Sequence, residues 1–85
     1  MTTKRDVRIV AIPNGFVFIG AYRVQGNAVI LSQASVIRVW GTTNGLGQIV
    51  DRPTKETVLD LCGFVEIPAS QVLFSIKCSS DWPLP

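Results

Sequence analysis

Histidine is absent from this 85-residue sequence, and charged residues are scarce. Without histidine the chain lacks the commonest general base and a frequent metal ligand. Charged residues make up 16% of the chain, against about 25% in typical globular proteins. The net charge of +2 is too small to predict nucleic-acid binding by itself. These deficits predict a protein that is not an enzyme.

Cysteine is also rare, with only Cys62 and Cys78 present. Two cysteines are too few for a disulfide scaffold, and no partner residues complete a zinc site. We predict that both are reduced and have no functional role. The carboxylates are scattered without a paired spacing: they are Asp6, Asp51, Glu56, Asp60, Glu66 and Asp81. The sequence therefore predicts no catalytic residue, no metal site and no cofactor.

A long apolar run is missing as well. No run approaches the roughly 20 residues that a membrane-spanning helix needs. The first six residues are polar and lead directly into a strand pattern, without the separate apolar segment of a signal peptide. We expect a cytoplasmic protein with no membrane partner, in the host cytosol if it is encoded by a phage.

Hydrophobic residues, by contrast, make up 47% of the chain. A chain of this length forms one domain, residues 1–85, with a thin core. Segments 16–23 and 72–78 are apolar on both faces of a strand, so part of this surplus must lie at the surface. Self-association would bury it between subunits. Residues 79–85 form a polar tail containing proline, in which Trp82 is the one expected anchor.

Alternating apolar residues and frequent turn residues predict a β-rich fold. Expected strands cover 6–12, 16–23, 28–31, 35–40, 64–67 and 72–78, with strand character also at 57–61. Ser32-Gln33-Ala34 is expected to be a break, Cys62-Gly63 a turn, and Gly20 a bend or bulge. A short helix is expected over 46–51, before Pro53. The predicted fold is all-β, a small barrel or strongly bent antiparallel sheet of five to six strands with one short helical turn.

The stretch 37–50 has the densest concentration of special residues, with a strand ending at Trp40 and three glycines following. The glycine-rich part is either a tight connection or a loop whose N–H groups contact an anionic ligand. Arg38 and Trp40 share one side of the strand, where they suit a nucleotide ring and its phosphate, a subunit contact or plain surface packing. Arg8 and Arg23 would extend the basic surface if their strands are neighbours. The candidate ligand-binding residues are Arg38, Trp40, Thr42, Thr43, Asn44 and Gly45.

Segments 38–47 (RVWGTTNGLG), 53–55 (PTK) and 59–60 (LD) resemble a group of small uncharacterised proteins encoded by bacteriophages and prophages. The resemblance covers residues 7–77 and includes an N-terminal β meander. It implies a phage context, in which compact proteins act as assembly parts, inhibitors of host proteins or binders of defence signals. It assigns no site residue.

The leading functional hypothesis is a non-enzymatic homo-oligomeric binding protein that engages a host protein or sequesters a small anionic, nucleotide-like ligand. A nucleic-acid-binding small β-barrel and a structural virion or assembly component are the alternatives. Binding that falls steeply with salt would indicate nucleic acid. Saturable binding of a free nucleotide would indicate the small ligand.

Overall fold

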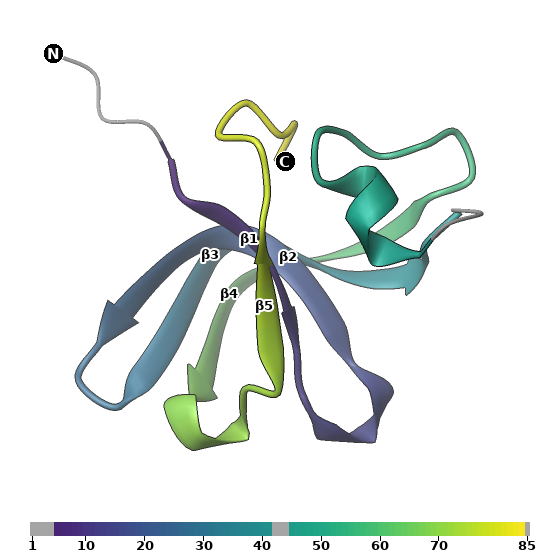
Figure 1. The fold of residues 1–85 in the computed structure, drawn as a ribbon. Helices are drawn as coiled ribbons and strands as arrows, with labels where there is room; N and C mark the ends of the chain where they lie inside the picture. The colour runs from purple at the N-terminus through teal and green to yellow at the C-terminus, as the bar shows by residue number, and fades with distance from the viewer. Residues whose placement is uncertain (1–4, 42–44, 85) are drawn as a thin grey trace, which may run out of the picture.

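Five antiparallel strands form a single sheet in the computed structural model, which describes residues 5–41 and 45–84 (Figure 1). The strands are β1 (Val7–Ala11), β2 (Val17–Gln25), β3 (Ala28–Val39), β4 (Val58–Pro68) and β5 (Phe74–Lys77). Their order across the sheet is β4-β3-β2-β1-β5. The predicted all-β class is confirmed. The bent sheet is the form observed, since β4 and β5 remain outer edges and the sheet does not close into a barrel.

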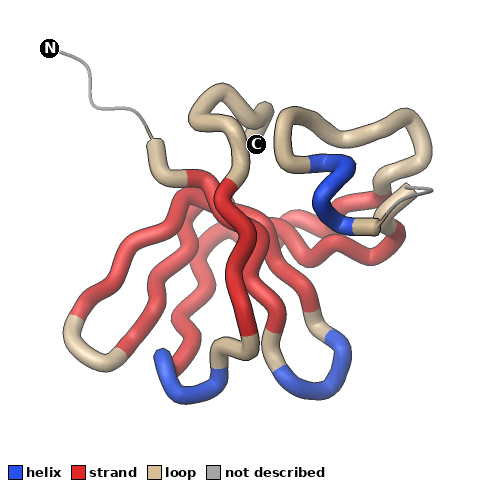
Figure 2. The backbone as a smooth tube through the Cα atoms, in the orientation of Figure 1, coloured by secondary structure: helices blue, strands red, loops and turns tan. Residues whose placement is uncertain are grey.

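Short 3-10 turns occupy connections between the strands (Figure 2). They are η1 (Pro13–Gly15), η2 (Leu46–Ile49) and η3 (Ala69–Gln71). The sequence predicted a helical segment only at the second of these positions, over 46–51. Proline at the start of η1 explains the first, because its ring presets φ for a tight turn.

β3 corrects the expected break at Ser32-Gln33-Ala34. The strand continues through these residues and its register with both neighbours shifts there. The register shifts at Gln33, whose φ is 51°. Such a bulge changes which residues face each side while the chain remains extended. Because the alternation of apolar residues shifts there, the sequence predicted two strands, although the chain forms one.

β4 corrects the expected turn at Cys62-Gly63 in the same way. Gly63 pairs with Ala34 and Leu61 pairs with Ser35, so Cys62 is the extra residue. The φ of Gly63 is +85°, which glycine adopts without strain. This bulge lies beside the bulge of β3 and restores the register between the two strands. The register of β2 with β3 shifts around Gly20, which confirms the irregularity expected there.

Buried apolar side chains form a cluster on each face of the sheet. We call one side the Trp82 face, whose buried cluster is Val7, Ile9, Ala11, Val17, Ile19, Ile37, Ile49, Cys78 and Trp82. The other is the Leu31 face, whose buried cluster is Val10, Val29, Leu31, Ala34 and Ile67. Val10 and Ile9 are adjacent and belong to different clusters. Strand β1, which lies between β2 and β5, is therefore covered by apolar side chains on both of its faces.

The C-terminal tail closes the Trp82 face together with the connection that contains η2 (Figure 1). The side chain of Trp82 is fully buried, and its indole Nε1 donates to the carbonyl of Ile49 at 2.6 Å. The Ser79 amide donates to the carbonyl of Val50 at 2.7 Å. These contacts confirm Trp82 as the anchor of the tail. Within the described ranges, no helix is long and apolar enough to cross a membrane.

Candidate functional site

Arg38 and Trp40 lie at the end of β3, and both are exposed. The Arg38 guanidinium binds the Asp60 carboxylate of β4, with 2.7 Å between Nη2 and Oδ1. The Trp40 side chain is 41% exposed. Gly45 is the N-cap residue of η2 and has a φ of +91°. The other three candidates, Thr42, Thr43 and Asn44, lie outside the described residues. The Arg38 guanidinium of the predicted site is therefore already paired with a carboxylate. An anionic ligand would compete with Asp60 for this guanidinium.

Two threonines hold the ends of the connection that follows Trp40. Thr57 Oγ1 donates to the Trp40 carbonyl at 2.7 Å, and Thr54 Oγ1 donates to the Gly41 carbonyl at 2.6 Å. The Thr54 amide in turn donates to Thr57 Oγ1 at 2.9 Å. The sequence analysis missed both threonines. Their spacing of three residues after Pro53 is a weak signal, because their acceptors lie at least thirteen positions away along the chain.

Gly41 allows the two ends of this connection to approach closely. A β-carbon at Gly41 would lie 2.5 Å from the carbonyl carbon of Glu56 and from the amide nitrogen of Thr57. Its φ of +66° also favours glycine. The close approach and the positive φ at Gly41 thus support the interpretation of this segment as a tight connection. Ligand contact by residues 42–45 stays a prediction.

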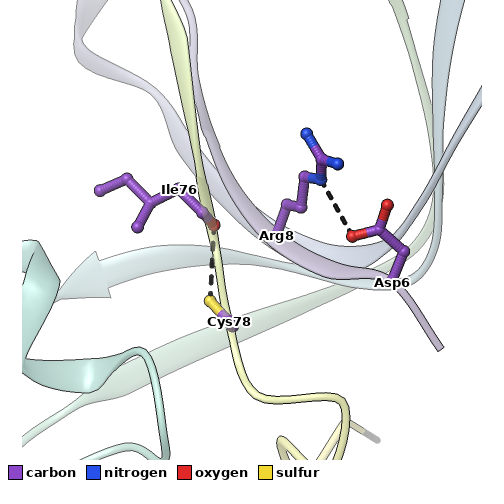
Figure 3. A network of polar contacts seen from close by, with 4 residues as sticks. All are labelled: Asp6, Arg8, Ile76 and Cys78. Carbon is purple, nitrogen blue, oxygen red and sulfur yellow. Dashed lines mark hydrogen bonds and ion pairs between the residues drawn. The ribbon is translucent and has the colours of Figure 1, made fainter. Parts of the chain in front are cut away.

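Arg8 and Arg23 do not extend one basic surface, although β1 and β2 are neighbours. Arg8 lies over the ring of Tyr22, with its guanidinium carbon 4.4 Å from the ring centroid. It also binds the Asp6 carboxylate at 2.9 Å (Figure 3). The hydrogen bond that the Arg8 guanidinium donates to the Asp6 carboxylate raises the pKa of Arg8. Arg23 is the next residue after Tyr22 on β2, so it projects from the opposite face. The expected shared surface is wrong because neighbouring strands can present their arginines on different faces.

The two cysteines differ in exposure, and neither forms a disulfide. Cys62 is exposed on the edge strand β4, whereas Cys78 is buried on the Trp82 face. The Cys78 thiol donates to the Ile76 carbonyl, with 3.6 Å between Sγ and the oxygen (Figure 3). Burial raises the pKa of Cys78 to about 11. The buried thiol thus stays protonated and unreactive at neutral pH.

The raised pKa of Cys78 predicts a loss of stability in alkali. In the unfolded chain the thiol ionises near its ordinary pKa of 9.0, whereas the fold holds it protonated up to about 11. Ionisation therefore favours the unfolded chain as pH rises from about 9 to 11. Across this window, wild type should lose at most about 2 kcal/mol of unfolding free energy relative to Cys78→Ala. Denaturant unfolding of both proteins at pH 7, 9 and 10.5 measures it. A difference that does not change with pH would contradict the assignment.

Both edge strands carry large apolar side chains that are open to solvent. On β4 these are Leu61, 70% exposed, and Phe64, 63% exposed; on β5, Phe74 is 49% exposed. Leu61 pairs with Ser35, which pairs with Ile19, so Leu61 projects from the Trp82 face. Phe64 precedes Val65 of the Leu31 face and projects from the Trp82 face as well. The two outer edges of the sheet therefore expose apolar groups on one side.

Two hollows on the surface lie away from the predicted ligand site. One, of about 230 Å³, opens between the β1–β2 connection and the end of β4, beside Phe18 and Ile67. The other, of about 400 Å³, lies between Arg52 and Asp81. Neither is lined by Arg38 or Trp40. Among the residues that the structure describes, no group of three His, Cys, Asp or Glu side chains is placed to hold a metal ion.

Comparison with known proteins finds no relative. No protein-family model matches the chain, and no curated protein or solved structure matches it significantly. The function of this protein must therefore be inferred from the geometry of the protein's own residues.

Proposed function

We propose that this protein is a non-enzymatic binding protein that works as a homo-oligomer. The observation that carries the proposal is the exposure of Leu61, Phe64 and Phe74 on the two outer strands. An outer strand also presents unpaired N–H and C=O groups along its edge. Apolar side chains beside such groups favour the addition of another strand, because association satisfies the hydrogen bonds and removes apolar surface from water.

The charge distribution on β4 supports this proposal. Natural edge strands are commonly protected by lysine, proline or very short length. β4 has eleven residues, its only proline is the last, and its only charged residues are Asp60 and Glu66. Asp60 is already paired with Arg38. The segment from Leu61 to Val65 thus carries no charge that would oppose association.

Self-association should be visible as a solution mass that is a multiple of 9.3 kDa. The variant Leu61→Ser/Phe64→Ser should shift the mass toward the monomer by removing apolar surface at the β4 edge. Val24→Ser is the matched control, because Val24 is 61% exposed but lies on the interior strand β2. Light scattering and sedimentation across micromolar concentrations measure these masses. A monomeric wild type would overturn the proposed function.

A small anionic, nucleotide-like ligand is the partner that Arg38 and Trp40 suit, and a host protein is the other partner consistent with an exposed edge. The exposed indole offers a stacking surface two residues along the chain from the guanidinium. In a phage context, which the resemblance implies, the oligomer would act as an accessory protein that sequesters such a ligand. The competing carboxylate of Asp60 makes this part of the proposal testable.

Arg38→Ala should weaken nucleotide binding about tenfold or more, because a charge-assisted hydrogen bond contributes about 1.5–3 kcal/mol. Asp60→Asn should strengthen the binding, since it frees the guanidinium. Titration of ATP, followed by Trp40 fluorescence and calorimetry, gives both dissociation constants, and a DNA oligonucleotide at several salt concentrations tests the nucleic-acid alternative. Dissociation of the oligomer by Arg38→Ala, without an effect of Asp60→Asn on affinity, would place Arg38 in the assembly contact instead.

A further inference from the structure

We infer that two copies of this chain join through their β4 strands, which pair antiparallel around a two-fold axis perpendicular to the sheet. The inference rests on the proposed self-association and assigns the surface that meets, its symmetry and its register. Among the described strands, β4 pairs only with β3, so its second edge is open. A two-fold axis in this direction reverses the strand but keeps each face of the sheet on the same side. The Trp82 faces of the two copies therefore form one continuous side.

β4 is the outer strand that lacks protection against pairing. It has eleven residues, carries no lysine or arginine, and has its only proline at the last position. β5, the other outer strand, has four residues and ends at Lys77, which is exposed. Short length and an exposed lysine are two of the features that keep natural edge strands from pairing. The second copy is therefore expected at the edge of β4.

The bulge of β4 gives this strand a self-complementary pattern of faces. Leu61 and Phe64 both project from the Trp82 face although they are three positions apart, because Cys62 is the extra residue between them. Asp60 and Val65 both project from the Leu31 face. Residues that lie opposite each other in an antiparallel pair share a face of the sheet. When β4 pairs with its own copy, Leu61 can thus lie opposite Phe64, and Asp60 opposite Val65.

One symmetric register forms both of these pairs. When Leu61 of each copy lies opposite Phe64 of the other, Cys62 lies opposite Gly63, and the two-fold axis passes between the two pairs of Cys62 and Gly63. The Leu61 and Phe64 side chains of both copies then form one apolar cluster on the Trp82 face. In the single chain these residues are 70% and 63% exposed, so the contact removes apolar surface from water.

Carboxylates stay apart in this register. The two Asp60 residues lie opposite Val65 at the two ends of the paired segment, about 13 Å or more from each other, which exceeds the screening length of about 8–10 Å. Each Asp60 also keeps Arg38 of its own copy as a partner. A shift by one residue would instead place Asp60 opposite Glu66 and Leu61 opposite Val65, and in both pairs the side chains would project from different faces. Charge and face therefore favour the same register.

Cys62 allows a crosslinking test in the unmodified chain, because it is exposed and Cys78 is buried. In the inferred register the two Cys62 residues belong to adjacent pairs beside the two-fold axis. Their Cα atoms are then about 6 Å apart, within the range that a disulfide spans. Under mild oxidation, wild type should give covalent dimers and no larger species, and peptide mass spectrometry should identify the link between the two Cys62 residues. Cys62→Ser/Lys77→Cys moves the thiol to the edge of β5 and is the control for random collision.

Charge complementation tests the register. Leu61→Lys and Phe64→Glu each place a charge in the apolar cluster, so each variant alone should be monomeric in light scattering. An equal mixture of the two variants should restore dimers, because the lysine introduced in one copy lies opposite the glutamate introduced in the other. A mixture of Leu61→Lys with Phe64→Lys is the matched control and should stay monomeric. Circular dichroism checks that each variant is folded.

The outcomes separate the inference from the proposed function. Cys62→Ser should abolish the crosslink while light scattering still reports the dimer. An oligomer without the link between Cys62 residues would overturn the inference but leave the self-association intact. The same holds for a linked oligomer whose monomeric variants are not restored to dimers by mixing. A wild type that is monomeric in light scattering would overturn both.

Discussion

Trp82→Ala is expected to lower the unfolding free energy by about 3–5 kcal/mol, the usual cost of truncating a buried aromatic residue to alanine. Domains of this size have about 4–13 kcal/mol in total, so the loss is a large part of the stability. The Trp82 side chain is fully buried against the β1–β2 part of the sheet and Ile49. Its removal leaves a cavity and deprives the Ile49 carbonyl of its donor. The tail and η2 should both loosen.

The second tryptophan supplies the control. Trp40→Ala should change the unfolding free energy by less than about 1 kcal/mol, because its side chain is substantially exposed. Urea unfolding of the two variants compares the costs directly. In native protein, Trp82 should give blue-shifted emission that is lost in Trp82→Ala, and hydrogen exchange should rise at Ile49. Equal destabilisation by the two changes would show that the tail does not support the core.

Gly41→Ala is expected to lower the unfolding free energy by about 3 kcal/mol or more, through two separate effects. The new β-carbon would lie 2.5 Å from main-chain atoms of Glu56 and Thr57, and backbone yields less readily than a side chain. The φ of +66° adds strain for any residue with a β-carbon. The threonine hydrogen bonds that hold the connection should break, since its two ends must move apart.

Gly26→Ala separates the two effects. Gly26 has a similar φ of +60°, but a β-carbon there would meet no atom within 4 Å. Gly26→Ala should lower the unfolding free energy by only about 1–2 kcal/mol, which is the effect of the left-handed conformation alone. Thermal and urea unfolding of the two variants give the difference that comes from close approach. Equal costs would mean that the ends of the connection are free to separate.

The sequence predicted the elements whose causes are local. Alternating apolar residues located β1 and β2, within the ranges 6–12 and 16–23 expected for them. Proline and glycine stand at Pro13 and Gly15 in the first connection, where their backbone preferences suit the tight turn observed. The isolated Trp82 in a polar tail indicated an anchor. Each prediction depends on the conformational preference or solvation of a few adjacent residues, which the chain carries wherever it folds.

The bulges were misread because their sequence signal resembles that of a turn. Around Gln33 and Gly63 the alternation changes phase, and small or polar residues accompany the change. A turn and a bulge both need such residues, and they differ only in whether neighbouring strands continue to pair. Pairing with β2 and β4 keeps β3 extended through Gln33. That information belongs to residues far away in the chain.

The candidate site was predicted only in part for the same reason. Arg38 and Trp40 share a strand end, as their spacing indicates, but Asp60 reaches Arg38 from twenty-two residues away through the register of β3 and β4. The exposed edges were likewise invisible in the sequence, because composition predicted surplus apolar surface without its location. The sequence by itself determined an all-β chain with too much apolar surface. Only the tertiary structure decided that β5 pairs with β1 and leaves β4 uncovered, because strand order depends on long-range pairing rather than on local preference.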